Sequence, residues 1–393
     1  MKGSFYSVPM PRVSGRYERS TTSGEEVAAF VPFALPPREP DLVPDAKLLQ
    51  SAEEALRHLE VAVDMVPSMD WFLYGFVRKE AVLSSQIEGV EATLTDLMTV
   101  ESQPPTTVDA DVQDVCNYLA ALEFARNQLA DPKGLPLSMR LLNETHAILM
   151  SGVRGADKAP GEPRRSQNWI GGTRPGNATF VPPPPHLLPE VLTDLEKYMH
   201  AEKQELSALV RVGLVHAQFE TIHPYLDGNG RLGRLLITLL FEHWKLLSKP
   251  LLYLSLFFKR HRGDYYQRLT AVRSNGDWEG WVSFFLEGVA AMALESVQTA
   301  KKLFRLVSQD RERVVSSDGV SISAVRLFEQ LPRRPILTAA GAETLLSTTR
   351  PTATKAISTL VALGVLKEVS GKQRDRSFAY VTYLDVLASE VAP

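Results

Sequence analysis

The sequence predicts a mainly α-helical protein with a β-hairpin flap in its helical core and a C-terminal winged helix-turn-helix domain. From about residue 45 to residue 307 the patterns are mostly helical, with apolar residues recurring at spacings of three, four and seven. Residues 164–181 differ, because two short strand-like runs flank the turn-rich sequence GGTRPGN. Beyond residue 320 the order is helix, helix, longer helix and strand pair, which is typical of a winged helix-turn-helix.

The first helix with a clear apolar face covers about residues 71–89. Phe76, Leu83 and Ile87 fall on one side of it, and Gly89 stands where a C-terminal glycine would end it. The first forty residues carry turn and extended signals without a helical period. Further helices are predicted at 108–129, 138–150, 206–222 and 232–244, with more helix up to about residue 307.

The predicted flap pairs residues 167–170 with residues 178–181, and the prolines at 182–185 end any pairing because proline has no N–H to donate. An edge of this hairpin could align a segment of another protein by strand addition. The C-terminal helices are predicted at 323–331, 339–346 and 351–364, with strands at 365–369 and 377–382. We therefore expect an N-terminal region at 1–105, a helical core at 106–307 and a winged-helix domain at 320–393.

Composition narrows the class of protein. The 393 residues are 44% hydrophobic and 23% charged, which are globular values, and the net charge of −3 gives no strong field toward nucleic acid or a membrane. The single cysteine, Cys116, excludes an intramolecular disulfide and a thiolate zinc site. Residues 1–12 lack the apolar core of a signal peptide, and the longest apolar run, 251–258, is too short to span a bilayer. We expect a cytoplasmic protein without a membrane partner.

The segment HPYLDGNGRLGR at 223–234 lies between two apolar helices and carries most of the chemistry. Gly228 and Gly230 allow positive φ and let consecutive N–H groups face inward. With the N-terminus of the following helix, these groups predict a concave site for an anion. Arg231 and Arg234 are three residues apart on that helix and can reach the same anion.

Two further residues of the segment suggest catalysis on a phosphate. A carboxylate at Asp227 would repel a bare phosphate, so it is best explained as a ligand of Mg²⁺ shared with phosphate oxygens. His223 stands at the mouth of the loop, and an ordinary histidine pKa of about 6.5 suits a general base at neutral pH.

Other nucleotide and metal motifs are excluded. Residues 228–233 also fit G-x-G-x-x-G, but a helix precedes them where the dinucleotide fingerprint needs a strand. The chain contains no G-x-x-x-x-G-K-[ST] and no H-E-x-x-H, which removes P-loop and zincin interpretations.

Residues 223–234 resemble the motif H-x-F-x-[D/E]-G-N-G-R-x-x-R of the Fic family of protein adenylyltransferases, with Tyr225 where the family mostly has Phe. Residues 167–172 and 180–184 resemble the flap of that family. Tyr265 with Tyr266, and residues 276–278, resemble segments that close its nucleotide pocket. The resemblance covers roughly residues 45–290 and implies a Fic-type helical core.

The resemblance implies a mechanism. His223 would deprotonate a Ser, Thr or Tyr hydroxyl of a target protein, which attacks the α-phosphate of Mg²⁺-bound ATP. Asp227 would bind the Mg²⁺, Arg231 would steady the phosphates, and Arg234 would hold the γ-phosphate. A related phosphate-transferring branch typically has lysine at the position of Gly230, so glycine favours transfer of AMP. The implied nucleotide-binding residues are Asp227, Gly228, Asn229, Gly230, Arg231, Leu232, Gly233, Arg234, Ile170, Gly171, Tyr265 and Tyr266.

Residues 84–89 resemble the inhibitory motif [S/T]-x-x-x-E-[G/N] of Fic proteins whose inhibitory helix precedes the core; Gly89 takes the last position. Glu88 falls at the C-terminal end of its helix, where the macrodipole disfavours an anion, so a cation partner is expected. The family suggests Arg234, which would then be withheld from the γ-phosphate, with Ser84 hydrogen-bonded in the same contact.

Two alternatives stay open at this stage. Glu88 could activate water to remove AMP from a modified target, with His223 as the acid. The C-terminal unit, with 9 Lys and Arg against 6 Asp and Glu from residue 321 onward, could bind DNA while the core senses a nucleotide, or serve as a protein-interaction or dimer module. The cations concerned are Arg350, Lys355, Lys372, Arg374 and Arg376. We expect self-modification besides an unidentified target.

Overall fold

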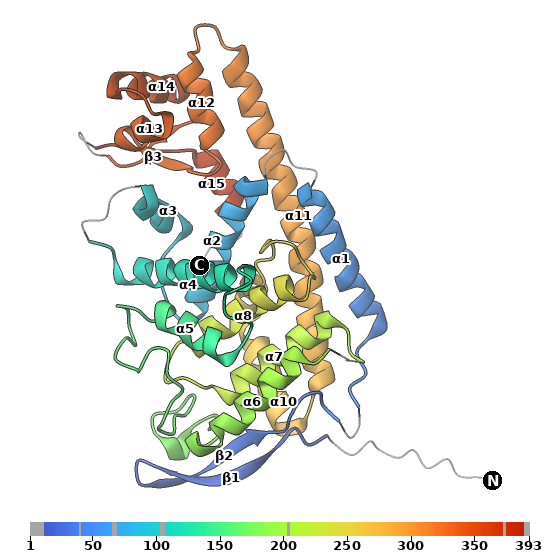
Figure 1. Ribbon diagram of the computed structural model, residues 1–393. Helices are drawn as coiled ribbons and strands as arrows, with labels where there is room; N and C mark the ends of the chain where they lie inside the picture. The colour runs from blue at the N-terminus through green and yellow to red at the C-terminus, as the bar shows by residue number, and fades with distance from the viewer. Residues whose placement is uncertain are drawn as a thin grey trace, which may run out of the picture.

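The computed structural model describes residues 12–38, 41–64, 69–102, 107–202, 205–371 and 375–388. Within these residues the fold is mainly helical, with one two-stranded and one three-stranded sheet (Figure 1). The predicted class, mainly α with small β elements, is confirmed.

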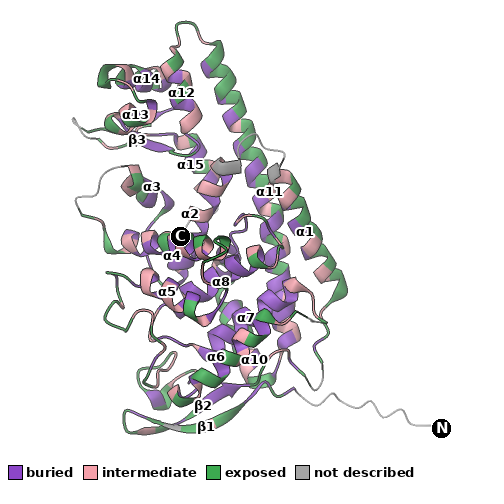
Figure 2. Cartoon of the chain, in the orientation of Figure 1, coloured by how far each residue is buried: buried purple, intermediate pink, exposed green. Residues whose placement is uncertain are grey.

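The centre of the molecule is built from α7 (Ala208–Ile222) and α8 (Asn229–His243). Every residue of α7 from 209 to 222 is buried, as expected for a helix that is apolar on most sides (Figure 2). Around this pair pack α4 (Ala110–Ala130) and α5 (Met139–Leu149), close to the predicted ranges. Both central helices were predicted, and α8 begins three residues earlier than expected.

The longest helix is α11 (Trp278–Ser316), whose 39 residues span about 58 Å. Helix α1 (Ala46–Asp64) packs along it over most of its own length (Figure 1). Helix α11 is long and apolar enough to cross a membrane, but 61% of its most apolar stretch is buried inside the protein. It also runs past residue 307, where the core was expected to end.

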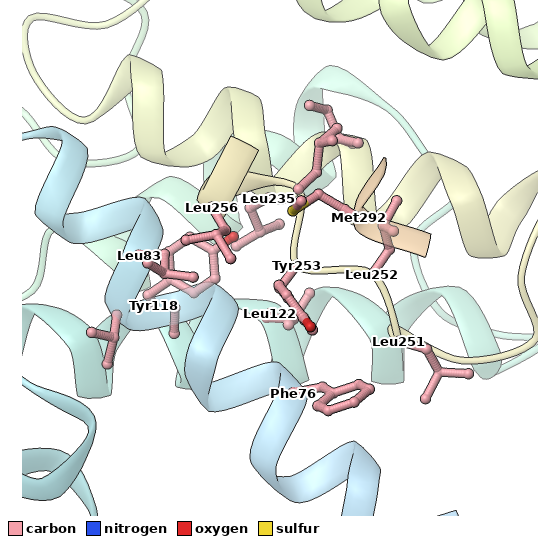
Figure 3. Close-up of a cluster of buried hydrophobic side chains, with 14 of the residues drawn as sticks. Phe76, Leu83, Tyr118, Leu122, Leu235, Leu251, Leu252, Tyr253, Leu256 and Met292 are labelled. Atoms are coloured by element: carbon pink, nitrogen blue, oxygen red, sulfur yellow. The ribbon is translucent and has the colours of Figure 1, made fainter. Parts of the chain in front are cut away.

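Helix α2 (Met69–Ile87) is the helix expected at residues 71–89, and Gly89 follows it at φ +88°. Its apolar face meets α4, α8 and α9 (Ser255–Arg260) in a cluster shown in Figure 3. There Leu83 of α2 lies close to Tyr118 and Leu256, and Phe76 packs against Tyr253 with ring centroids 5.2 Å apart. The remaining core helices are α3 (Leu94–Ser102), α6 (Leu188–His200) and α10 (Arg262–Asn275).

The N-terminal residues form an antiparallel hairpin of β1 (Gly15–Thr22) and β2 (Glu25–Pro32), which the sequence had indicated only as extended chain. The hairpin lies below α6 and α7 in Figure 1. The Phe30 N–H donates to the Val181 carbonyl at 2.9 Å, so β2 continues toward the predicted flap.

The flap itself differs from the prediction. Residues 167–170 and 178–181 are not strands, because only one isolated bridge joins Ile170 to Phe180. Gly171 and Gly172 both have positive φ, and a short 3₁₀ turn covers Pro175–Asn177. The two left-handed glycines and Pro175 interrupt the β-sheet hydrogen bonding beyond Ile170. The flap is therefore a narrow loop with a single pairing at its base.

The C-terminal unit contains α12 (Ile322–Gln330), α13 (Ala339–Leu346) and α14 (Arg350–Ala362), at the predicted places. Its sheet has the order β3-β5-β4 and is antiparallel. Strands β4 and β5 fall in the two predicted runs, whereas β3 and the final α15 were not predicted. Their bounds are β3 Ile336–Thr338, β4 Lys367–Glu368, β5 Ser377–Ala379 and α15 Val381–Ala388. Lys372 and Arg374 lie outside the described residues.

Candidate functional site

The loop between α7 and α8 begins at His223, which ends α7 in the left-handed conformation (φ 49°, ψ 63°). Its N–H still donates to the Phe219 carbonyl at 2.9 Å, so the turn closes the helix. A non-glycine residue rarely adopts this conformation, which costs about 1–2 kcal/mol unless neighbours hold it. The backbone around His223 is therefore held by other contacts of the site.

The half-buried ring of His223 is a neutral base. Burial lowers its pKa to about 3, and the charges of Arg273 and Arg164 lower it further, whereas Glu88 acts in the opposite direction. The ordinary value of about 6.5 expected from the sequence is thus wrong for the free protein. At pH 7 the imidazole is unprotonated and can accept a proton.

The side chain of Asn229 shapes the loop from inside. Its Oδ1 accepts from the Tyr225 N–H and its Nδ2 donates to the Tyr225 carbonyl, both at 2.8 Å. Asn229 was expected to line the anion site, but its side chain is 2% exposed and serves the loop, so only its backbone N–H is left for an anion. Tyr225 is also fixed at its hydroxyl, which donates to Asn143 at 2.7 Å.

The first turn of α8 offers backbone N–H groups to a ligand. The first N–H to donate within the helix is that of Leu232, which bonds the Gly228 carbonyl at 3.0 Å. The N–H groups of Asn229, Gly230 and Arg231 precede it and have no carbonyl inside the helix to donate to. Gly228 (φ +76°) turns the chain into this position, and a Cβ there would overlap Met150. These N–H groups are therefore available at the place where an anion was expected, and anion binding there stays a prediction.

Asp227 lies beside this helix start. Its side chain is 42% exposed, and its Oδ1 accepts from the Gly228 N–H at 2.6 Å and lies 3.7 Å from Arg231 Nη2. The described residues include no group of three or more side chains able to cage a metal ion. Mg²⁺ is commonly held by one or two carboxylates with phosphate oxygens supplying further ligands, so an exposed Asp227 beside an anion site fits this ion.

Arg231 is tied to α4. Its guanidinium pairs with Asp114 of α4 in a short contact, and the two side chains are each 5% exposed. Its Nη2 also donates to Met150 Sδ at 3.3 Å and lies 3.7 Å from Asp227 Oδ1. The guanidinium thus joins α8 to α4 beside the carboxylate of the helix start, and the phosphate contact that the resemblance implies stays a prediction.

Arg234 is held by the C-terminal end of α2. Its Nη2 donates to Glu88 Oε1 at 2.6 Å and to the Ser84 carbonyl at 2.9 Å, while its Nε donates to Ser84 Oγ at 2.9 Å. A Cβ on Gly230 would overlap Glu88 Oε1, so the glycine makes room for this carboxylate at the start of α8. The ion pair implied by the resemblance is present, with Ser84 inside it.

The two partners of this pair differ in exposure. The Arg234 side chain is 1% exposed and that of Glu88 is 34% exposed, and Glu88 sits one residue past the end of α2. Burial acts to raise the pKa of Glu88, but the charge and hydrogen bond of Arg234 outweigh it and lower the pKa overall. The carboxylate is thus ionised at neutral pH and neutralises Arg234.

Several expected nucleotide-binding residues belong to the core instead. Leu232 is fully buried, and Gly233 packs against α7, where a Cβ would overlap Glu220. Tyr265 is 1% exposed, and its hydroxyl lies 2.9 Å from His216 Nε2. Tyr266 is 42% exposed and near enough for the charge of Glu88 to raise its pKa, after burial. Of the two tyrosines, Tyr265 is thus part of the core and Tyr266 is the one exposed to solvent.

At the flap, Ile170 makes the single backbone pairing with Phe180, and Gly171 is kept free of a Cβ by Thr179. The chain at 178–181 is covered on both sides, by Ile170 and by β2. An added target strand would therefore have to use the edge of residues 167–170.

Residues remote in sequence complete the site, and sequence reasoning missed them. His146 accepts from the Gly161 N–H at its Nδ1 (2.8 Å), so its Nε2 carries the proton that it donates to the Asp227 carbonyl (2.9 Å). Its ring stacks on Tyr225 at 3.9 Å between centroids. Burial lowers the pKa of His146 to about 4, which keeps this arrangement neutral. No local pattern marks this histidine in the sequence.

The amino-acid sequence matches two family models, Fic/DOC family N-terminal at residues 46–127 and Fic/DOC family at residues 136–241. It is 25% identical over 182 residues to a probable protein adenylyltransferase of Aquifex aeolicus, covering 46% of this chain and 52% of that protein. It is 29% identical over 169 residues to the protein adenylyltransferase Fic of Culex quinquefasciatus, covering 43% of this chain and 30% of that protein. The matches thus span about half or less of these relatives' length.

Two solved structures share the fold. A Fic family protein from Desulfovibrio desulfuricans superposes with a TM-score of 0.53 at 20% identity, over 86% of this chain and 98% of that chain. A Fic domain-containing signaling protein from Bacteroides thetaiotaomicron superposes with a TM-score of 0.52 at 17% identity, over 65% of this chain and 97% of that chain.

Proposed function

We propose that this chain, which matches Fic/DOC family models and is distantly similar to protein adenylyltransferases, is a Fic/DOC protein that transfers AMP from ATP to a protein hydroxyl. One observation carries the proposal: the free N–H groups at the start of α8 directly follow a loop that carries a neutral imidazole, His223, and an exposed carboxylate, Asp227. Anion binding, a base and a metal ligand are what nucleotidyl transfer requires.

In the proposed step, a Ser, Thr or Tyr hydroxyl oxygen attacks the α-phosphorus of ATP while its proton passes to the unprotonated ring nitrogen of His223. The bond from the α-phosphorus to the bridging oxygen breaks, and pyrophosphate leaves with the electron pair. The N–H groups of Asn229, Gly230 and Arg231 bind phosphate oxygens and orient the nucleotide for in-line attack. Asp227 would hold Mg²⁺, which supplies charge neutralisation on the phosphates when bound.

We further propose that Glu88 restrains this activity. Arg234 Nη2 donates to Glu88 and to the Ser84 carbonyl, so this nitrogen is not free to bind the γ-phosphate of ATP. Glu88 also lies over Gly230, in the space above the helix start. A carboxylate there repels a triphosphate and leaves ATP in an unproductive pose.

The test compares Glu88→Gly, His223→Ala and the unchanged protein in labelled ATP with Mg²⁺. We expect Glu88→Gly to raise AMP incorporation, including self-modification, at least about tenfold, which corresponds to about 1.4 kcal/mol of released restraint. We expect His223→Ala to abolish incorporation in either background, because no base remains.

Glu91→Gly is the matched control, since it removes the same side chain from an exposed position three residues away. Equal AMP incorporation by the Glu88 and Glu91 variants would contradict the proposal that Glu88 restrains the activity. If neither the Glu88→Gly protein nor any protein of a lysate becomes labelled, the proposed transferase activity is contradicted.

A second candidate function reverses the reaction. Glu88 lies close enough to His223 for its charge to act on the pKa of the imidazole, so we propose as an alternative that this carboxylate activates water against an AMP-modified hydroxyl. This candidate predicts release of AMP from a protein that was modified beforehand, and loss of that release in Glu88→Gly.

A further inference from the structure

We propose that Arg164 is a positioning residue that fixes the backbone of His223 and fastens the flap to it. The kinetic part of the inference rests on the proposed transfer of AMP; the structural part does not. Arg164 lies just before the flap, outside the residues 223–234 that carry the chemistry.

The guanidinium of Arg164 is bonded to backbone carbonyls. Its Nε donates to the His223 carbonyl at 3.0 Å, and its Nη2 donates to the Pro183 carbonyl at 2.6 Å and to the Ile222 carbonyl at 3.4 Å. Its Nη1 donates to the Ser166 carbonyl at 3.4 Å. These acceptors come from the end of α7 and from both ends of the flap, so one side chain joins three segments.

The backbone of Arg164 adds a further bond on the same turn, because its N–H donates to the Pro224 carbonyl at 2.8 Å. Three consecutive carbonyls, those of residues 222, 223 and 224, therefore accept from this one residue. The last carbonyls of a helix have no partner within it, and a cation near them is favoured by the macrodipole. Arg164 thus caps α7 at the point where His223 leaves it.

Burying the charged guanidinium of Arg164 costs desolvation free energy, which its hydrogen bonds must offset. The side chain is 3% exposed, and no carboxylate pairs with it among the described residues. Desolvation lowers the pKa of Arg164 to about 10, so the guanidinium stays charged at neutral pH. A buried charge that is held only by carbonyls is tolerated where those carbonyls need a donor.

The His223 turn and the flap both require contacts from outside their own segments. His223 adopts a left-handed conformation that a non-glycine residue holds only under constraint. The flap has a single backbone pairing of its own, at Ile170 and Phe180, so it too depends on outside contacts. A second arginine contacts the same base of the flap: Arg273 lies 3.9 Å from the Phe180 ring and donates to the Glu220 carbonyl of α7 at 3.1 Å.

The experiment compares Arg164→Gln and Arg164→Lys with Arg165→Gln, all in the Glu88→Gly background. Arg165 is the matched control, because its side chain is 88% exposed and pairs with Glu162 at 3.0 Å on the surface. We expect Arg164→Gln to lower kcat by about 10- to 100-fold and to change the KM for ATP less than about twofold, since the helix start and Arg234 are untouched. Lysine can reach only part of the carbonyl set and should restore part of kcat.

Hydrogen exchange of the same variants measures how firmly Arg164 holds the flap, independently of enzyme activity. We expect faster exchange at residues 164–183 in Arg164→Gln than in Arg165→Gln, with α11 unchanged. A merely structural role would lower the amount of folded protein while leaving kcat per folded molecule as in the control. If Arg164→Gln does not fold, Arg164→Lys carries the same comparison.

The proposal is overturned if the Arg164 variants match Arg165→Gln in both kcat and flap exchange. If the Glu88→Gly parent itself transfers no AMP, the proposed function fails, while the exchange data still decide whether Arg164 holds the flap.

Discussion

Two arginines three positions apart on α8 have carboxylate partners of very different exposure. Arg231 pairs with Asp114, whose side chain is 5% exposed, whereas Arg234 pairs with Glu88, whose side chain is 34% exposed. Loss of either carboxylate leaves a buried guanidinium without that partner, but Glu88 already contacts solvent and can be hydrated when it leaves, whereas Asp114 cannot. Arg231 is thus the permanent link of α8 to α4, and Arg234 the releasable one to α2.

Asp114→Asn should lower the free energy of unfolding by about 3 kcal/mol, because it leaves the buried Arg231 charge unneutralised. It also weakens the bond from Ser85 Oγ to Asp114 Oδ1, 3.2 Å in length. Denaturant unfolding measures the change, with Glu123→Gln on the exposed face of the same helix as control. Equal stability of the two variants would mean that the pair contributes no net stabilisation.

The site could be predicted only as far as its residues are close in sequence or share a family pattern. The loop at 223–234 and the Glu88–Arg234 pair follow from such patterns. Asp114 and Arg164 do not, because they lie 117 and 59 residues from the partners Arg231 and His223. Their role comes from how helices pack, and one sequence carries no local signal of that.

Helix α2 carries a buried acid of its own, Glu80, in addition to Glu88 just beyond its end. Glu80 accepts from the Ser255 N–H at 3.1 Å and from its hydroxyl at 2.5 Å, next to α9. Burial raises the pKa of Glu80 to about 7, and the bonds from Ser255 and the charge of Arg234 offset this only in part. The folded protein therefore keeps this proton at pH values where the unfolded chain has lost it.

This predicts a pH dependence that Glu80→Gln removes. Between pH 4.5 and about 7 the folded state binds one more proton than the unfolded state, so the stability that Glu80 contributes falls as the pH rises through this window. Relative to the unchanged protein, Glu80→Gln should gain about 3 kcal/mol between pH 4.5 and 7. Unfolding curves at several pH values test this; a constant difference between the two proteins contradicts it.

At the level of elements, strong apolar periodicity predicted α7 and α8 well, whereas the small β elements were predicted poorly. Strand β1 reads GRYERSTT, which has almost no apolar alternation, and it forms because β2 offers it a partner along its whole length. Tertiary packing therefore decided what this weakly patterned segment became. Helix α6 was not predicted although its buried residues Leu188, Val191, Leu192 and Leu195 recur at helical spacing, so its pattern was present in the sequence and was missed.

The whole molecule is joined through α2 as well as through α11. The last helix, α15, packs on the first half of α2, where Leu387 lies against Gly75 and the Tyr383 hydroxyl donates to the Trp71 carbonyl at 3.4 Å. Gly75 permits this approach, since a Cβ there would press on Leu387. The C-terminal unit thus contacts the same helix that ends beside the candidate site.

Leu387→Ala should destabilise this junction by about 2–5 kcal/mol, because a fully buried leucine leaves a cavity between α15 and α2. Hydrogen exchange should then quicken in α15 and in the first half of α2, with Asp385→Ala, exposed on the same helix, as control. Unchanged exchange in α2 would show that α15 does not support it.

Gly75 and Glu88 are thirteen residues apart, which in a continuous helix is about 20 Å. A rod of that length does not bend easily, so a displacement at one end is felt at the other. A partner or ligand that changes the contact of α15 with α2 would therefore alter how readily the candidate site binds a triphosphate. A bound triphosphate would in turn alter the contact of α15 with α2.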